Sequence, residues 1–210
     1  VSGITGVAKD RIIDAARMYA TTDKAMIIYS LGMTEHTTGT YNVMALGNLA
    51  TVTGHLGRAS VGINPTRGQN NVQGSCDMGA LPDKFVGYQT VGDPNAQKKF
   101  EKAWGVKLDD KKGLTCTEMD IAMNEGKLKG YYIFGEDPAM TNANVSFVKS
   151  GLKKLDFLVV QDILPTETTE FAHVVLPGSS HAEKDGTFTN GERRIQLIRK
   201  AIDPLCGKAD

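Results

Sequence analysis

The chain has 210 residues, of which 40% are hydrophobic and 23% are charged, and its formal net charge is zero. This composition is typical of a soluble globular protein with one large domain or parts of two, and the lack of a basic excess disfavours a nucleic-acid binder. No apolar run approaches the roughly 18–20 residues that span a bilayer, so no membrane span is expected.

The first third of the chain carries the pattern of an open α/β sheet. Apolar spacing predicts an amphipathic helix over Thr5–Thr21, a strand over Ala25–Tyr29 and a second helix over Thr38–Thr53. The segment His55–Gln89 then shows no apolar period and is rich in glycine and asparagine. A long loop of this kind indicates a functional segment, because glycine lets the backbone approach a ligand closely.

Regular elements resume after this loop. The sequence predicts helices over Pro94–Trp104, Thr115–Glu125, Asn144–Leu152 and Thr166–Phe171, strands over Tyr131–Phe134, Phe157–Val160 and His173–Leu176, and a β-hairpin over Thr187–Ile198. Thr115 and Glu118 have the spacing of a capping box, and Asn190-Gly191 would supply the left-handed hairpin turn. Apolar strands separated by helices predict an α/β fold with parallel, doubly wound sheets.

Glycine and mostly polar residues follow each predicted strand, at the carboxyl edge where open α/β sheets bind ligands. They are Gly32 and Met33, then Gly135, Glu136 and Asp137, then Gln161 and Asp162, and last Ser179 and Ser180. Asp137 and Asp162 would accept hydrogen bonds from a guanine or a ribose, and helix capping is the alternative role of Asp137. Thr141 and Ser179 would serve phosphate. The motifs GxGxxG and GxxxxGK(S/T) are absent after these strands, which disfavours ordinary NAD or ATP binding.

Arg67 stands in an otherwise neutral, glycine-rich segment, Pro65–Gly74. Its planar fork matches the two oxygens of a small carboxylate, and the alternative is a surface arginine bound to solvent or to carbonyl groups. The amino terminus shows no signal pattern and no initiator Met. A cytoplasmic location is therefore favoured, although an export signal could lie in a missing amino-terminal part.

The histidines and cysteines show no metal-binding spacing. His36, His55, His173 and His181 form no HxxxH or HExxH motif, and Cys76, Cys116 and Cys206 form no CxxC pair. The cysteines are expected to be small, semi-buried thiols. His36 could face a ligand, His173 is expected to be structural, and Glu167 and Glu170 are expected on a solvated helix face.

The segment Arg67–Gly79, RGQNNVQGSCDMG, closely resembles the signature loop of molybdopterin-dependent formate dehydrogenases, which belong to the dimethyl sulfoxide reductase superfamily. The resemblance continues in the expected order through Tyr29–Thr34, Thr53–Arg58, Gly135–Pro138, Gln161–Ile163, Val175–Pro177 and Asp185–Asn190. It covers nearly the whole chain, and RGQNNVQG with its flanks is its most specific part. The chain therefore resembles an internal fragment of the catalytic (alpha) subunit.

The resemblance implies formate oxidation to carbon dioxide and a bis-molybdopterin guanine dinucleotide cofactor with molybdenum or tungsten. Arg67 would orient the formate carboxylate near the metal, and Gly68 and Gln69 would line the pterin. Gly32 and Met33 would contact the cofactor from the first α/β unit. The residues that would hold the pyrophosphate, ribose and guanine of one dinucleotide are Gly135, Glu136, Asp137, Thr141, Gln161, Asp162 and Ser179.

The resemblance also implies two adjoining domains, with residues 1–68 in the first cofactor-binding domain and residues 69–210 in the second. The family's 4Fe–4S cysteines, the cysteine or selenocysteine with histidine beside the metal, and the carboxy-terminal domain are absent from this sequence, so the segment alone is expected to be inactive. Electron-transfer subunits are the implied partners. Two alternatives stay open, a non-catalytic pterin-domain module of a respiratory complex and another oxidoreductase of the superfamily acting on nitrate or another oxo-anion. The Arg67 loop disfavours both.

Overall fold

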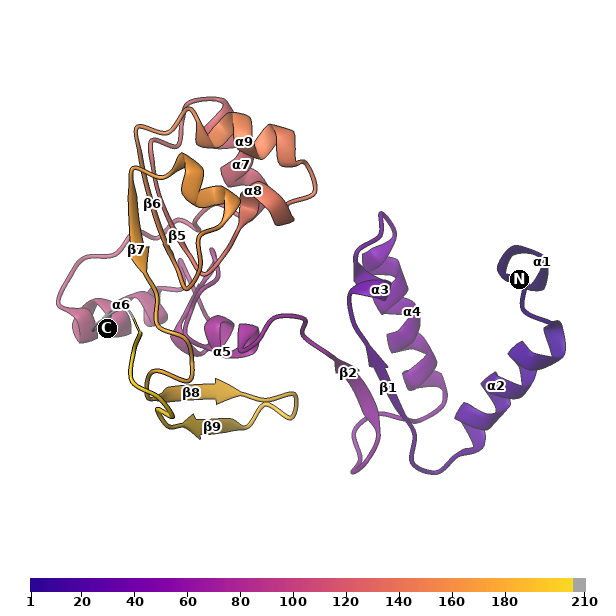
Figure 1. The fold of residues 1–210 in the computed structure, drawn as a ribbon. Helices are drawn as coiled ribbons and strands as arrows, with labels where there is room; N and C mark the ends of the chain where they lie inside the picture. Colours follow the sequence, from indigo (N-terminus) through magenta and orange to yellow (C-terminus); the bar gives the residue numbers. More distant parts are fainter. Residues whose placement is uncertain (206–210) are drawn as a thin grey trace. The chain divides into compact units, whose positions relative to one another are not determined.

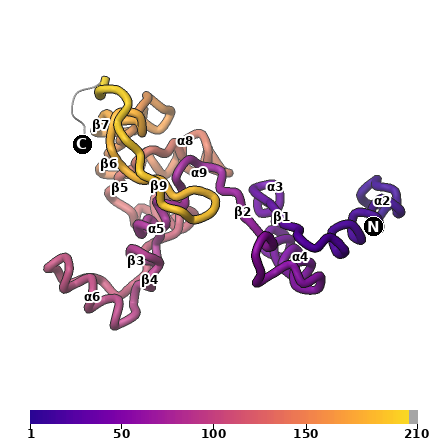
Figure 2. Tube along the Cα trace, turned by 90° about the horizontal axis from the view of Figure 1, so that it is seen from below, coloured from indigo at the N-terminus to yellow at the C-terminus, as the bar shows by residue number. Residues whose placement is uncertain are grey.

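The computed structural model describes residues 1–205, which form two compact units (Figures 1 and 2). Unit 1 comprises residues 1–72 and 191–194, and unit 2 comprises residues 73–190 and 195–205. Cys206, predicted to be a semi-buried thiol, lies outside the described residues. None of the helices in residues 1–205 is long and apolar enough to cross a membrane.

Unit 1 is built on two parallel strands. Its elements are α1 (Ser2–Thr5), α2 (Lys9–Thr21), β1 (Met26–Tyr29), α3 (Leu31–Thr34), α4 (Gly39–Val52) and β2 (Gly62–Pro65). The pairing of β1 with β2 runs from Met26 opposite Gly62 to Tyr29 opposite Pro65. The helix, strand and helix that the sequence predicts before residue 55 are confirmed.

The segment His55–Gln89 is not one long loop, so that prediction is wrong. It contains β2, α5 (Val72–Asp77), β3 (Lys84–Phe85), the 3₁₀ helix η1 (Val86–Tyr88) and β4 (Gln89–Thr90). The strand β2 has a single large aliphatic side chain, Ile63, so no alternation of apolar and polar residues marks it. Its main-chain hydrogen bonds come from β1, which no local pattern reports.

The fully buried side chain of His55 connects the end of α2 to the end of α4 in unit 1. Its Nε2 hydrogen-bonds the carbonyl of Thr22 at 2.8 Å, and its Nδ1 hydrogen-bonds the hydroxyl of Thr53 at 2.8 Å. The ring of Tyr19 lies 4.6 Å away, centroid to centroid. Because a buried imidazole without partners would be costly, these contacts fix the place where the chain turns toward β1.

Unit 2 contains a three-stranded parallel sheet. Its strands are β5 (Gly130–Phe134), β6 (Phe157–Asp162) and β7 (Val174–Pro177), in the order β5-β6-β7. Its helices are α6 (Pro94–Trp104), α7 (Cys116–Asn124), α8 (Pro138–Thr141), α9 (Val145–Leu152) and the 3₁₀ helix η2 (Glu167–Phe171). Thr115 and Glu118 form the predicted capping box of α7. The predicted strands, helices and α/β class with parallel sheets are confirmed.

The core of unit 2 lies between this sheet and the helices α7 and α9 (Figure 1). Ile133, Leu158 and Val160 point into it from the strands, and Met123 and Leu152 meet them from the helices. All five are at most 3% exposed. Burying a side chain of this size contributes roughly 1.5–3 kcal/mol. This packing fixes the strand ends that carry the site described below.

The predicted hairpin is present, but its predicted turn is wrong. β8 (Gly186–Thr189) pairs with β9 (Ile195–Ile198), with Thr189 opposite Ile195. Arg193, with a φ of 61°, has the left-handed backbone, whereas Asn190 and Gly191 do not. Residues 190–194 make a longer loop than the two-residue turn that Asn-Gly favours, so that pair is not forced into the left-handed region.

Candidate functional site

In unit 1, the predicted site residues follow two neighbouring strands. Gly32 and Met33 lie in α3, directly after β1, and Arg67, Gly68 and Gln69 follow β2. The strands β1 and β2 are parallel and in register. All five residues therefore come at the same carboxyl edge, where parallel sheets bind ligands.

Hydrogen bonds join the two strand ends at this edge. The N–H of Thr66 donates to the carbonyl of Tyr29 at 2.7 Å, and the hydroxyl of Ser30 donates to the carbonyl of Thr66 at 2.7 Å. A Cβ atom built on Gly68 would lie 3.6 Å from Leu31 Cδ1, an ordinary contact. The start of α3 and the segment after β2 thus lie against each other.

The side chain of Arg67 is exposed, and among residues 1–205 it has no ion-pair or hydrogen-bond partner. Its guanidinium is therefore available to an anion, as the carboxylate hypothesis requires. His36 is also exposed, and its Nε2 hydrogen-bonds the carbonyl of Gly32 at 2.9 Å. The side-chain amide of Asn42 donates to the carbonyl of Met33 at 3.0 Å. The backbone of α3 is thus held by two side chains.

In unit 2, the predicted residues gather at the carboxyl edge of β5-β6-β7. Gly135 has a left-handed φ of 65°, and its N–H donates to the carbonyl of Gln161 at 2.9 Å. The N–H of Gly178 donates to the carbonyl of Asp162 at 2.8 Å, and the carboxylate of Asp162 accepts from the N–H of Ile163 at 2.6 Å. These bonds hold the turns after the three strands side by side.

The side chain of Gln161 reaches both strands next to its own. Its Oε1 accepts a hydrogen bond from the hydroxyl of Tyr132 on β5, and its Nε2 donates to the carbonyl of Pro177 on β7 at 3.4 Å. One amide thus connects all three strands.

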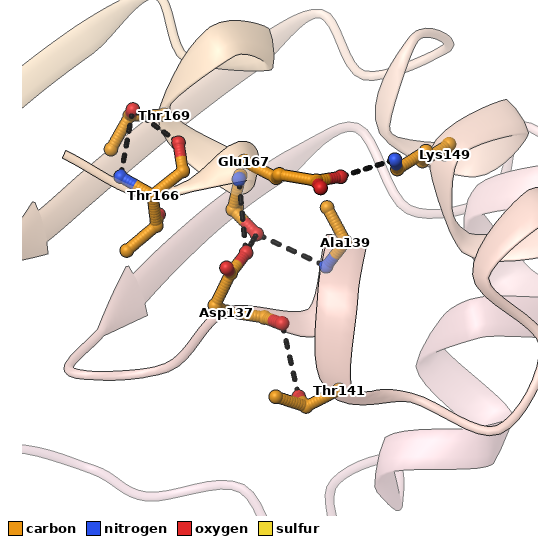
Figure 3. A network of polar contacts seen from close by, with 8 residues as sticks. Asp137, Ala139, Thr141, Lys149, Thr166, Glu167 and Thr169 are labelled. Carbon is orange, nitrogen blue, oxygen red and sulfur yellow. Dashed lines mark hydrogen bonds and ion pairs between the residues drawn. The ribbon is translucent and has the colours of Figure 1, made fainter.

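Asp137 begins α8, but its carboxylate does not cap that helix and instead accepts from the first turn of η2. Its Oδ1 accepts a hydrogen bond from the backbone N–H of Thr168 at 3.0 Å and another from the Thr168 hydroxyl at 2.6 Å (Figure 3). The same hydroxyl accepts from the N–H of Ala139 at 3.1 Å. The carboxylate therefore joins the turn after β5 to η2.

The remaining predicted residues of this edge are Glu136, Thr141 and Ser179. Glu136 and Thr141 are exposed, and the Thr141 hydroxyl donates to the carbonyl of Asp137 at 3.0 Å. Ser179 is half-buried and follows β7. A Cβ atom built on Gly135 would meet nothing within 4 Å, so the turn faces open space. The carboxylates and hydroxyls can accept hydrogen bonds from the donor groups of a guanine or a ribose. The open glycine turn leaves room for a phosphate to approach the backbone closely.

Tyr131 lies half-buried on β5 and packs against the core of unit 2. Burial, and to a smaller extent the negative charge on Cys116, Asp120 and Glu136, raises the pKa of Tyr131 to about 12. Tyr131 is therefore neutral at physiological pH and acts as a packing residue. Cys76 is buried, in line with the sequence, but Cys116 is exposed, so the prediction of a semi-buried thiol is wrong there.

The sequence predicts a structural role for His173 and a solvated helix face for Glu167 and Glu170, and both glutamates are exposed. The Nδ1 of His173 accepts a hydrogen bond from the N–H of Leu158 at 3.0 Å, which confirms its structural role. Glu167, at the start of η2, forms an ion pair with Lys149 on α9. Among residues 1–205, no group of three or more His, Cys, Asp or Glu side chains is arranged to hold a metal ion.

Sequence reasoning missed Thr168 and Tyr132, which hold two of the predicted residues in place. Thr168 stands among other threonines in Thr166–Thr169, so nothing in the local pattern distinguishes it. Tyr132 belongs to an apolar strand, and its hydroxyl gains a role only because β6 pairs beside it. Both contacts are between residues far apart in the sequence.

The family model described as molybdopterin oxidoreductase matches residues 7–208. The chain belongs to the molybdopterin oxidoreductase family. In this family it is similar to the alpha subunit of an F420-dependent formate dehydrogenase from Methanocaldococcus jannaschii, with 53% identity over 97% of the chain and 30% of that protein. It is 45% identical to formate dehydrogenase H of Escherichia coli, over 97% of the chain and 29% of that protein.

One solved structure has a similar fold. Acetylene hydratase from Pelobacter acetylenicus aligns with a TM-score of 0.65 at 19% identity, over 97% of the chain and 31% of that protein. At this identity the likeness supports the fold alone. The molybdopterin oxidoreductase segment described here thus spans about 30% of the length of the formate dehydrogenases just named.

Proposed function

We propose that the chain is an internal part of the catalytic subunit of a formate dehydrogenase, which oxidises formate to carbon dioxide. The observation that carries this proposal is 45–53% identity over 95–97% of the chain to proteins named as formate dehydrogenases. Because the segment covers under a third of those relatives, we expect it to need the rest of the subunit for turnover.

The proposed cofactor is bis-molybdopterin guanine dinucleotide with molybdenum or tungsten. In the proposed arrangement, residues 1–68 belong to one cofactor-binding domain and residues 69–210 to a second. Gly32 and Met33 would contact the cofactor from the first domain, and Gly68 and Gln69 would line the pterin. The guanine end would be held by Gly135, Glu136, Asp137, Thr141, Gln161, Asp162 and Ser179. A 4Fe–4S cluster and the electron-transfer subunits would lie outside this segment, and a cytoplasmic location is proposed.

When bound, the metal–pterin centre supplies the two-electron chemistry of formate oxidation. The role proposed for Arg67 is to bind the formate anion through two parallel hydrogen bonds, which restrict the direction of the carbon–hydrogen bond. Its exposed guanidinium, without a carboxylate partner among residues 1–205, supports this role. A lysine there would keep the charge but lose the bidentate geometry.

The test uses the full-length gene product that contains this chain, purified with its cofactor. Arg67→Ala is expected to lower kcat/KM for formate by about 100-fold or more, because a displacement of about 1 Å in the substrate costs that much. Arg67→Lys is expected to recover part of the loss. Arg17→Ala changes an exposed arginine on α2 and serves as the control. A wild-type rate in Arg67→Ala would remove the substrate role of this residue.

Cofactor analysis of the same protein separates the proposal from its alternatives. Molybdenum or tungsten, together with GMP released by acid hydrolysis, is the expected content. A subunit without metal and pterin would be a non-catalytic module. A loaded subunit that reduces nitrate and leaves formate unchanged would be another oxidoreductase of the family. Either result overturns the proposed activity.

A further inference from the structure

We propose that Thr168 is a positioning residue for the guanine end of the cofactor, acting through Asp137. It would lock the turn between β5 and α8 so that one carboxylate oxygen of Asp137 faces the nucleotide. This inference rests on the proposed function, because it concerns the same edge of unit 2. Thr168 is not among the residues that the sequence assigned to the site.

Three hydrogen bonds between Asp137, Thr168 and Ala139 hold this turn, and they are called the lock below. The N–H and the hydroxyl of Thr168 both donate to Oδ1 of Asp137, at 3.0 Å and 2.6 Å. The N–H of Ala139 donates to the same hydroxyl oxygen at 3.1 Å. The hydroxyl therefore donates to the carboxylate and accepts from the backbone of the next turn, which sets its own direction. Hydrogen bonds to an ionised carboxylate are shorter and stronger than neutral ones.

The burial of Thr168 and Ala139 keeps water out of these hydrogen bonds. Thr168 and Ala139 are both 0% exposed, so water cannot replace the hydroxyl as a partner. Asp137 is only half-buried and lies between these residues and the surface. Its Oδ2 has no hydrogen bond within residues 1–205, in contrast to Oδ1. Oδ2 is thus the oxygen left to accept hydrogen bonds from a guanine or a ribose.

The turn that carries Thr168 is itself anchored (Figure 3). The N–H of Thr166 donates to the hydroxyl of Thr169 at 3.2 Å, and that hydroxyl donates back to the carbonyl of Thr166 at 2.6 Å. Glu167 in the same turn pairs with Lys149 on α9. Since η2 is held at both of these points, Thr168 offers Asp137 a fixed partner. Pre-set geometry of this kind is what a binding group at a strand end needs.

The test compares Thr168→Val with Thr168→Ser in the cofactor-loaded, full-length enzyme. Valine keeps the shape but removes two of the three hydrogen bonds, so release of the cofactor, measured as GMP in the filtrate after dilution, is expected to be roughly tenfold faster. Serine keeps the hydroxyl and is expected to restore wild-type retention. Thr117→Val is the control, because it removes a hydroxyl from an exposed position on α7 and leaves η2 and Asp137 untouched.

Thermal unfolding of the cofactor-free proteins separates positioning from loss of fold. Equal melting temperatures in Thr168→Val and Thr117→Val, with fast release in the first alone, support the lock, and equal release in both overturns it. If Thr168→Val does not fold, Thr168→Ala decides, since it removes the same two hydroxyl hydrogen bonds and leaves the Asp137 carboxylate in place. Faster release supports the inference, and wild-type retention overturns it.

GMP release from the wild-type enzyme separates a wrong cofactor assignment from a wrong role for Thr168. A wild-type enzyme that yields no GMP on acid hydrolysis overturns the guanine dinucleotide and the lock together. A wild-type enzyme that yields GMP, with a Thr168→Val variant that retains it equally well, overturns the lock alone.

Discussion

The hydroxyl of Tyr132 donates a hydrogen bond to Oε1 of Gln161 on the neighbouring strand, at the edge of the sheet where unit 2 would hold its nucleotide. Because Gln161 also donates to the carbonyl of Pro177, its amide cannot rotate without losing one of two partners. The amide is thereby fixed in one orientation. Its remaining hydrogen-bonding capacity then has a set direction, which is what recognition of a nucleotide requires.

Tyr132→Phe is therefore expected to affect cofactor retention more than stability. Tyr132 is 55% exposed, so losing this bond should cost less than about 1 kcal/mol, or no more than about 4 °C in melting temperature. The GMP content of the purified full-length enzyme should fall, because the Gln161 amide is free to turn. Tyr41→Phe, at a tyrosine that is 73% exposed on α4, is the control. Equal GMP contents in the two variants would contradict the role of Tyr132.

Leu158→Ala should destabilise the chain by about 2–5 kcal/mol, because it removes a fully buried side chain from the middle strand of the sheet. Leu164→Ala makes the same chemical change at a side chain that is 67% exposed, and a change within about 0.5 kcal/mol is expected there. Denaturant unfolding of both variants gives the comparison. Similar losses in the two would mean that the core of unit 2 does not lie beneath β6.

Thr115→Ala tests the start of α7, where the Thr115 hydroxyl accepts from the N–H of Glu118 and the Glu118 carboxylate accepts from the N–H of Thr115. Removing the cap should cost about 1 kcal/mol. Thr117→Ala, an exposed threonine inside the same helix, should be neutral or slightly stabilising, because alanine is the better helix former. The melting temperatures of the two variants, each compared with the wild type, measure the contribution of the cap. A larger loss in Thr117→Ala would show that the cap does not hold the helix.

The capping box shows which part of the fold the sequence predicts. Both of its residues lie within one turn, so the pattern and the structure report the same contacts. The strands β5, β6 and β7 were predicted for a similar reason, since each is a short apolar run between breaks in the pattern. In these places local preference and tertiary packing agree.

Elsewhere the decisive contact is distant, and the sequence does not report it. The strand Gly62–Pro65 depends on main-chain hydrogen bonds with β1, whose paired residues lie 36 positions earlier in the sequence. The partner of Asp137 is Thr168, 31 residues further along the chain, and no local pattern indicates this contact. The carboxyl edge of the sheet in unit 2 is predictable, because the ends of the apolar runs mark it in the sequence. The side chains that fix the geometry of this edge are not predictable, because their contacts depend on how the turns pack.

Tyr131 leads to a prediction at alkaline pH. Mainly through burial, and further through nearby negative charges, its pKa is raised from the ordinary 10 to about 12. The folded state therefore favours the neutral phenol. The stability that this preference contributes is complete below pH 10 and is lost as the pH rises toward 12. Because solvent reaches part of the ring, we expect the free energy of unfolding to fall by about 1 kcal/mol, which is less than the whole pKa shift would correspond to.

Tyr131→Phe has no proton to lose, so between pH 9 and pH 11.5 the wild-type chain should lose about 1 kcal/mol more stability than this variant. Denaturant unfolding at the two pH values measures the difference, with Tyr41→Phe as the exposed control that should follow the wild type. Absorbance of tyrosinate gives an independent check, since one tyrosine should ionise later than the exposed ones. A Tyr131→Phe variant that loses as much stability as the wild type would mean that water reaches this hydroxyl freely, and the packing of β5 against α7 would then be looser than the buried core implies.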